Sequence, residues 1–212
     1  MKKIFAITVL SAFLANSAFA DDVKIGILLG FTGPIESLTP DMASGAELAI
    51  KEASDSGAFM NGSKISSVRG DSTCVDAASA TATAERLITS DGVSAIMGAD
   101  CSGVTTAVLQ NVATAKGVVM ISPSATSPAL STIKDNGLFF RTSPSDARQG
   151  QILAQILKEK NIKSAAMSYT NNDYGKGLAD SIQKNFEAIG GKITISASHE
   201  DGKGDYGAEV AA

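Results

Sequence analysis

Small hydroxyl residues and glycine stand at two points of the chain where they could hold an anion. Ser102-Gly103 falls at the predicted start of a helix, and Ser124-Ala125-Thr126 follows a short apolar run predicted as a strand. Backbone N–H groups at a helix start, together with a hydroxyl, can bind a carboxylate or phosphate without a basic side chain. Alternatively, Ser102 only caps its helix, and the other residues are ordinary loop chemistry. The residues alone leave both interpretations open.

Patterns that would indicate catalysis or a metal site are missing from the sequence. It contains no G-x-S-x-G, G-x-x-x-x-G-K-[ST] or H-E-x-x-H segment, and the glycines after the first strand lack dinucleotide-binding spacing. Residues 201–205 superficially resemble a calcium loop, but Tyr206 stands where the turn glycine belongs. The single histidine, His199, is expected to be a solvated loop residue. We predict a protein that is not an enzyme and has no cofactor and no metal.

The first 20 residues have the features of a secretory signal peptide. Lys2 and Lys3 precede an apolar run over 4–14, and Ala18-Phe19-Ala20 gives the small-x-small pattern of a cleavage site. The run is short for a membrane-spanning helix, although a membrane anchor or a buried N-terminal helix remains the alternative. No cysteine follows Ala20, which argues against a lipoprotein. We predict cleavage after Ala20 and export to the periplasm.

The net charge of the chain argues against nucleic-acid and anionic-lipid partners. The chain has a formal net charge of −4, and loss of the two leader lysines would change it to −6. An acidic protein lacks the basic surface that a nucleic-acid backbone or an anionic membrane requires. We therefore expect no nucleic-acid partner and no membrane docking.

Two cysteines, Cys74 and Cys101, are present in the whole chain. In an exported protein an even pair indicates a disulfide first. Metal binding is the weaker alternative, because one histidine and two isolated thiols do not complete a zinc shell.

Apolar runs and amphipathic stretches alternate regularly along the chain, as strands and helices do in α/β proteins. Near-continuous apolar strands joined by helices predict a doubly wound parallel sheet with helices on both faces. The predicted strands are 23–29, 64–70, 93–97, 118–121, 138–141, 165–169 and 192–197. The predicted helices begin at Thr39 as N-cap and near Asp76, Gly103, Ser145 and Tyr174, and the one from Gly103 runs over 103–116. In the helix from Ser145, Ile152 and Ile156 are predicted to point inward, with Leu153 and Leu157 as further candidates.

Loops after the carboxyl ends of the strands should carry any ligand site. These are residues 30–38, 71–75, 98–103, 122–131 and 170–174. A Pro- and Ser-rich stretch near 122–146 is the predicted boundary between a first lobe, 21–140, and the start of a second, 141–212. Residues 206–212 read as an unfinished helix, so we expect this chain to be the N-terminal part of a longer protein.

Several of these segments together resemble one family. The turn Gly33-Pro34, the spacing Asp71-x-x-Cys74 and Gly98-x-x-Cys101-Ser102, and the segments Ile121-Ser-Pro-Ser-Ala-Thr126 and Asp173-Tyr174-Gly175-x-Gly177 occur in order. They resemble the periplasmic branched-chain amino-acid binding proteins, the type I solute-binding proteins of ABC transporters. The resemblance runs over 21–212 and implies a two-lobed α/β fold that closes on its ligand.

The resemblance also implies roles for individual residues. Cys74 and Cys101 match the family's disulfide, and Ser102 matches the residue that holds the ligand carboxylate. Thr126 matches the residue that bonds both the carboxylate and the ammonium. Two further matches are Ser124, whose carbonyl meets the ammonium, and Tyr174, an aromatic that the second lobe brings over the ligand. Leu38 stands where leucine-type binders often have an aromatic.

Two functions follow as hypotheses. The first is a monomeric periplasmic protein that captures a small amino acid and delivers it to the permease subunits of an ABC transporter. The second is a ligand-sensing receptor module on the same fold. A sensor would continue into a membrane span or a signalling domain, whereas a transport protein would end after the second lobe.

Overall fold

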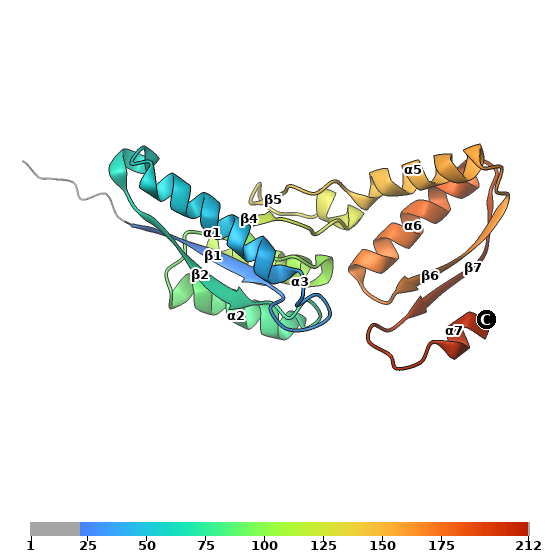
Figure 1. The fold of residues 1–212 in the computed structure, drawn as a ribbon, viewed down its shortest axis with the longest axis horizontal. Coiled ribbons are helices and arrows are strands. Elements are labelled where there is room, and N and C mark those ends of the chain that lie inside the picture. Colours follow the sequence, from blue (N-terminus) through green and yellow to red (C-terminus); the bar gives the residue numbers. More distant parts are fainter. Residues whose placement is uncertain (1–21, 212) are drawn as a thin grey trace, which may run out of the picture.

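Two parallel β-sheets organise the protein (Figure 1). The computed structural model describes residues 22–211, so the predicted signal peptide and its cleavage site lie outside the described residues. The first sheet has five strands in the order β2-β1-β3-β4-β5, and the second consists of β6 and β7. The strands are β1 (Val23–Leu29), β2 (Ile65–Asp71), β3 (Ala95–Gly98), β4 (Val119–Ser122), β5 (Phe139–Arg141), β6 (Ser164–Thr170) and β7 (Lys192–His199).

Side chains alternate between the two faces of β1, as the period of a strand requires. Ile27 and Leu29 pack with α1 (Thr39–Asp55) on one face. Leu28 belongs to the larger core on the other face, with α2 (Ala77–Thr89) and α3 (Ser102–Val108). Because helices cover both faces of a parallel sheet, the doubly wound α/β fold is confirmed, and the predicted strands agree to within about two residues.

Helix starts follow the predicted capping chemistry with one exception. The Asp76 carboxylate accepts hydrogen bonds from the N–H groups of Ala78 and Ser79, as expected of an N-cap. Thr39, however, was predicted as the N-cap of α1 and is instead its first residue, after Leu38. The Thr39 hydroxyl is fully buried and donates to the Gly30 carbonyl at 3.0 Å, so it ties the helix to the loop after β1.

The single helix predicted over 103–116 is a helical run of three segments. These are α3, the π-helical η2 (Leu109–Ala113) and α4 (Thr114–Lys116). The Thr114 hydroxyl donates to the Leu109 carbonyl at 2.7 Å, five residues earlier. The Thr114 backbone N–H donates to the same carbonyl, which is the bond that defines a π turn. Gly117 ends the run with φ +70°, which suits a residue without Cβ.

The second sheet is covered by α6 (Asp173–Ala188), which contacts both strands, and α5 (Asp146–Glu159) packs on α6. Ile152 and Ile156 were predicted to point inward, and this is wrong: they are 42% and 38% exposed. The face that meets α6 carries Gly150 and Ala154 instead, because a Cβ at Gly150 would lie 2.2 Å from Ser181 Oγ. Small residues thus let the two helices approach closely.

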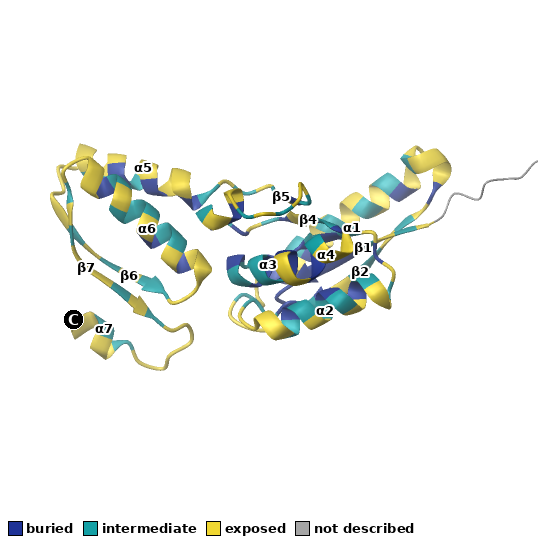
Figure 2. Ribbon diagram, turned by 180° about the vertical axis from the view of Figure 1, so that it is seen from behind, coloured by how far each residue is buried: buried dark blue, intermediate teal, exposed yellow. Residues whose placement is uncertain are grey.

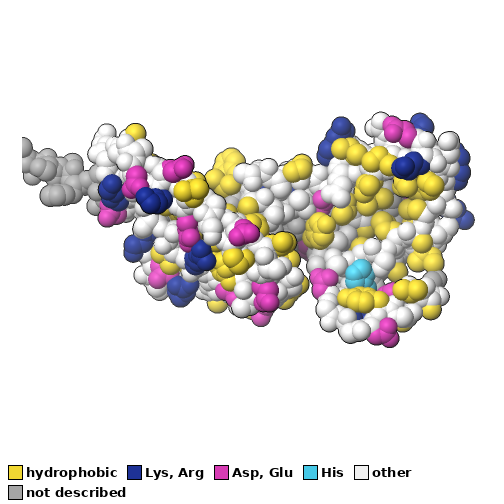
Figure 3. All heavy atoms as spheres, in the orientation of Figure 1, with side chains coloured by type: hydrophobic (Ala, Val, Ile, Leu, Met, Phe, Trp, Pro, Cys, Tyr) yellow, Lys and Arg dark blue, Asp and Glu magenta, His cyan; other side chains and the backbone are white. Residues whose placement is uncertain are grey.

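Burial differs between the two sheets. Buried residues concentrate in the first sheet and its helices, whereas β6 and β7 are half-buried or exposed (Figure 2). Hydrophobic side chains gather on the surface around the second sheet and its helices (Figure 3). The remaining segments are η1 (Phe59–Gly62), η3 (Pro128–Ser131) and α7 (Gly207–Ala211). None of the described helices has both the length and the apolar composition to cross a bilayer.

Candidate functional site

Ser102 and the loop 123–127 meet at the carboxyl edge of the first sheet. β3 leads into α3, which Ser102 begins, and the paired strand β4 leads into the loop. The Ser127 N–H donates to Ser102 Oγ at 3.1 Å, and Ser102 is buried. Three of the four predicted site residues, Ser102, Ser124 and Thr126, therefore lie on two segments that are bonded to each other.

Asp100 links the loops at this edge. Its carboxylate accepts from the Gly30 N–H at 2.7 Å, the Ser72 hydroxyl at 3.1 Å and the Cys101 N–H at 3.0 Å. Its carbonyl accepts from the Ser124 hydroxyl at 2.9 Å. Asp100 is 2% exposed, so this buried charge is satisfied by hydrogen bonds from three strand ends. Asp100 was not among the residues selected from the sequence, although a carboxylate directly after a buried strand is a usable signal.

The predicted disulfide between Cys74 and Cys101 is confirmed. It joins the loop after β2 to the N-cap residue of α3. Thr73 and Cys74 have φ values of 57° and 68°, in the left-handed region. At Gly33 (φ +99°) a Cβ would lie 2.4 Å from the Thr73 carbonyl oxygen, so only glycine fits there. The loops after β1 and β2 are therefore fixed against the start of α3.

Backbone groups without partners remain at this edge. Cys101 provides no side-chain cap, so the N–H groups of Ser102, Gly103 and Val104 have no hydrogen-bond partner within residues 22–211. The same holds in the described structure for the Ser124 carbonyl and the Thr126 N–H. By contrast, α2, α5 and α6 each have a side-chain cap. The edge thus combines N–H donors with one carbonyl acceptor.

The Thr126 hydroxyl points into the protein. Thr126 Oγ1 and Asp146 Oδ2 are both buried, and neither has a hydrogen-bond partner among the described residues. Burial raises the pKa of Asp146 above its ordinary value of 3.8, and the nearby Thr126 hydroxyl and Arg141 guanidinium oppose the shift only in part. Thr126 therefore has two polar groups, its N–H and its buried hydroxyl, that lack a hydrogen-bond partner among residues 22–211.

Tyr174 lies on a different element from the other predicted residues. It is in the first turn of α6, 43% exposed, and lines a cavity of 230 Å³ between α6 and the second sheet. Within residues 22–211 no hydrogen bond joins Tyr174 to Ser102 or Thr126. The same helix does reach the loop region, because a Cβ at Gly177 would lie 2.9 Å from Pro128 Cδ. Leu38 is 60% exposed at the start of α1.

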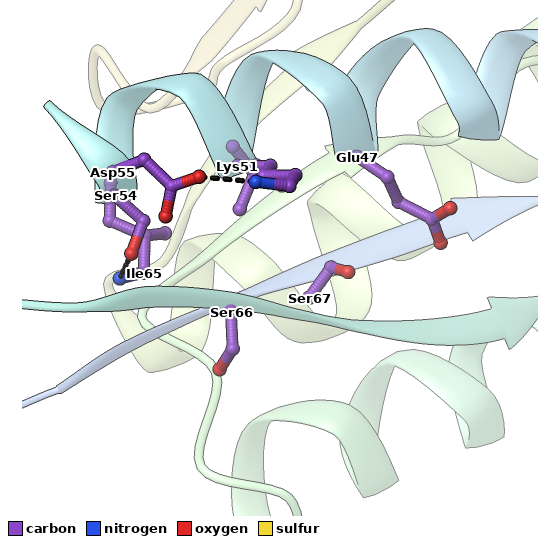
Figure 4. A pocket seen from close by; sticks show the side chains of 8 residues that line it. Glu47, Lys51, Ser54, Asp55, Ile65, Ser66 and Ser67 are labelled. Atoms are coloured by element: carbon purple, nitrogen blue, oxygen red, sulfur yellow. Dashed lines mark hydrogen bonds and ion pairs between the residues drawn. The ribbon is translucent and has the colours of Figure 1, made fainter.

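A larger hollow of 440 Å³ lies away from this edge, between α1 and the outer strand β2 (Figure 4). Its charged side chains are already paired, Lys51 with Asp55 and Glu47 with Arg69. Ser54 Oγ accepts from the Ile65 N–H at 3.1 Å and ties the helix to the strand. Within residues 22–211 no group of three His, Cys, Asp or Glu side chains is placed to hold a metal ion.

Asp71, at the end of β2, should make the free energy of unfolding depend on pH in the acidic range. Although burial raises its pKa, hydrogen bonds from the Thr32 hydroxyl (2.6 Å) and from the N–H groups of Thr73 (2.8 Å) and Thr32 (3.3 Å) outweigh burial, so the pKa is lowered from 3.8. A carboxyl group whose pKa is lower in the folded state than in the unfolded state stabilises the fold at pH values above the unfolded-state pKa. That stabilisation is lost as the pH falls through the folded-state pKa.

Asp71→Asn is therefore expected to lower the free energy of unfolding at pH 6 and to differ less from the unchanged protein at pH 2.5. Urea unfolding at both pH values measures this. Glu36→Gln, which removes an exposed carboxylate from the loop before α1, is the control. An Asp71→Asn loss of equal size at both pH values would contradict the prediction.

Comparisons with known proteins agree with this architecture. A family profile described as periplasmic binding protein matches residues 22–212. The chain is 30% identical over 211 residues to the leucine-, isoleucine-, valine-, threonine- and alanine-binding protein of Pseudomonas aeruginosa, covering 99% of this chain and 55% of that protein. It is 35% identical over 216 residues to the Leu/Ile/Val-binding protein homolog 1 of Brucella abortus, covering 99% and 56%.

Among solved structures, the branched-chain amino acid transporter substrate binding protein LivJ from Streptococcus pneumoniae, in complex with isoleucine, has a TM-score of 0.76. It is 31% identical, and the match covers 90% of this chain and 53% of that one. A benzoate complex of a solute binding protein from R. palustris has a TM-score of 0.78 at 23% identity, over 90% and 51%, and shows the shared fold alone. The chain spans about half the length of the curated relatives it matches. With a profile match over residues 22–212 and the same parallel-sheet architecture, the chain belongs to the periplasmic binding protein family.

Proposed function

We propose that this chain forms the amino-acid-recognising part of a periplasmic solute-binding protein that delivers its ligand to the permease of an ABC transporter. The observation that carries the proposal is the set of unpaired backbone groups at one sheet edge. These are the N–H groups that open α3, the Thr126 N–H and the Ser124 carbonyl.

This set suits a zwitterion better than a simple anion. A carboxylate accepts hydrogen bonds and would use the N–H donors and the Ser102 hydroxyl. An ammonium group donates hydrogen bonds and needs an acceptor, which the Ser124 carbonyl supplies. Hydrogen bonds to charged groups are stronger than those between neutral groups, which favours an α-amino acid in a site closed away from water.

The rest of the ligand would meet side chains from both sheets. Tyr174, on α6, is proposed to cover the ligand from the second lobe, and Leu38 offers an aliphatic surface from the first. We assign residues 21–140 to the first lobe and 141–212 to the start of the second, because β5 is the last strand of the first sheet. The relatives' printed ligands, which include leucine, isoleucine and valine, support an aliphatic amino acid. A monomer that binds and releases its ligand without chemistry fits this role.

Ser102→Ala tests the carboxylate site. The change removes a hydroxyl but keeps the backbone donors, so we expect amino-acid affinity to fall about 10- to 100-fold, as loss of about 1.5–3 kcal/mol from a bond to a charged group implies. Thr126→Val, nearly isosteric, should weaken the same ligand comparably. Calorimetric titration of the full-length mature protein with aliphatic and small polar amino acids is the measurement.

Ser44→Ala, on the exposed side of α1, is the matched control and should bind like the unchanged protein. If Ser102→Ala and Thr126→Val both bind the best ligand with unchanged affinity, the carboxylate site is elsewhere. If the unchanged protein binds no amino acid of the panel, amino acid as the cargo is wrong.

A further inference from the structure

The segment that follows the last strand of the first sheet is hydrogen-bonded to the candidate binding loop, residues 123–127. We call residues 141–146 the connector, because they run from the end of β5 to the start of α5. Thr142 donates through its N–H to the Ser122 carbonyl at 3.1 Å and through its hydroxyl to the Pro123 carbonyl at 3.4 Å. The Asp146 N–H donates to the Thr126 carbonyl at 3.0 Å. The connector therefore follows the loop along its length.

Arg141 makes the central contacts. One guanidinium nitrogen, Nη1, donates to the carbonyls of Ala125 at 3.3 Å and Ser127 at 2.9 Å, and Nη2 bonds the Ser131 hydroxyl. Among the carbonyls of residues 122–127, only that of Ser124 then has no partner in the described structure. Connector residues donate hydrogen bonds to all the remaining carbonyls of residues 122–127.

Because peptide units are planar, these contacts determine the directions in which the Thr126 N–H and the Ser124 carbonyl point. In a planar trans peptide the C=O of one residue and the N–H of the next point in opposite directions. Holding the Ala125 carbonyl on the connector side therefore directs the Thr126 N–H to the other side. Similarly, the Ala125 N–H donates to Ser122 Oγ at 2.9 Å, which turns the Ser124 carbonyl away from Ser122. The Thr126 N–H and the Ser124 carbonyl, the two free groups of the loop, thus each belong to a peptide unit whose opposite group is hydrogen-bonded.

We propose that Arg141 is a positioning residue of the binding site, which fixes the peptide unit that presents the Thr126 N–H to the ligand carboxylate. This inference rests on the proposed function for its ligand but not for its structural part. Nη1 bonds the two carbonyls that flank Thr126 while Nη2 of the same planar group bonds the Ser131 hydroxyl, and the single nitrogen of a lysine does not reproduce this fork. The Ser143 hydroxyl, also in the connector, donates to the Ala125 carbonyl at 3.4 Å as well. Arg141 also ends β5, so the same side chain couples the loop to the crossing between the sheets.

Arg141→Lys tests the proposal, with Arg141→Gln as a second variant and Arg148→Lys, exposed on α5, as the matched control. In the ligand-free full-length protein, we expect hydrogen–deuterium exchange to become faster in peptides covering 123–131 and to stay unchanged in β1 and β3. We expect amino-acid affinity to fall about tenfold or more by calorimetry, with the melting temperature close to that of the unchanged protein. Arg148→Lys should change neither exchange nor affinity.

The outcomes separate this inference from the proposed function. Unchanged exchange over 123–131 in both Arg141 variants overturns the positioning role, whatever the ligand. Faster exchange with unchanged affinity also overturns it, because the loop would then be anchored without consequence for binding. Faster exchange spread over the whole first sheet indicates a general structural role and overturns it as well. If the unchanged protein binds no amino acid, the proposed function fails, and the exchange measurement alone decides whether Arg141 orders the loop.

Discussion

Replacing Cys74 and Cys101 together with serine is expected to lower the free energy of unfolding by about 3–4 kcal/mol. The two cysteines are 27 residues apart, and cross-linking a loop of that size removes chain entropy from the unfolded state by about this amount. The bond also joins the loop after β2 to the first turn of α3, so its loss loosens the edge that carries Ser102. Urea unfolding of the oxidised protein and of the double variant measures the difference.

A reductant supplies the control for this prediction. It should shift the midpoint of the unchanged protein toward that of the double variant and leave the double variant where it is. Equal unfolding free energies for the oxidised protein and the double variant would show that the crosslink contributes no net stability.

Leu87→Ala is expected to cost about 3 kcal/mol of stability, within the range of about 2–5 kcal/mol found for buried Leu→Ala changes. Leu87 is fully buried on α2 and packs where two neighbouring strands carry glycine. A Cβ added at Gly26 would lie 3.3 Å from Leu87 Cδ1, and one at Gly70 would lie 2.9 Å from the same atom. The leucine thus fills a socket that the two glycines leave open, and alanine would leave a cavity there.

Leu48→Ala is the matched control, because Leu48 is 57% exposed on α1 and its truncation should change stability by less than about 0.5 kcal/mol. Gly70→Ala alone should be destabilising, since its methyl group meets Thr83 Cγ2 at 2.7 Å and Leu87 Cδ1 at 2.9 Å. Combined with Leu87→Ala, it should cost less than the sum of the two changes, because both act on one socket. Thermal or urea unfolding of the unchanged protein, the two single variants and the double variant tests this. Simple additivity of the destabilisation by Gly70→Ala and Leu87→Ala would contradict the socket.

Much of the fold follows from patterns that act locally. The apolar run of β1 and the Asp76 cap depend on neighbours in sequence, and both are confirmed. The inward face of α5 does not follow locally, because Ile152 and Ile156 form one apolar stripe while Leu153 and Leu157 form another. The choice between the stripes depends on the close approach of Gly150 to Ser181, which only the packed pair of helices reveals.

The candidate site divides in the same way. Ser102, Ser124 and Thr126 could be selected from residue type, position after a strand, and family resemblance, and their roles remain predictions. Asp100 could have been noticed from its place after a strand, but its partners Gly30 and Ser72 lie far away in the chain and could not be predicted. Arg141 could not be selected, because its contacts depend on how the chain folds back onto the loop after β4. Which peptide groups stay unpaired depends on those contacts, so it too lies beyond sequence reasoning.

The outer strand β2 has a consequence for how molecules of this protein meet one another. Within residues 22–211 only one of its edges is paired, with β1, and an unpaired strand edge is a template onto which another chain can add. Here α1 runs beside the strand, and the hollow between them is bordered by serines and by the charged side chains of Glu47, Lys51 and Asp55 (Figure 4). An incoming backbone would have to strip water from those charges before it could pair. Ile50 and Ile65 are the apolar members of a lining that otherwise consists of serines and charged side chains. We therefore expect this groove to disfavour the addition of a further strand and the sheet to resist edge-to-edge aggregation.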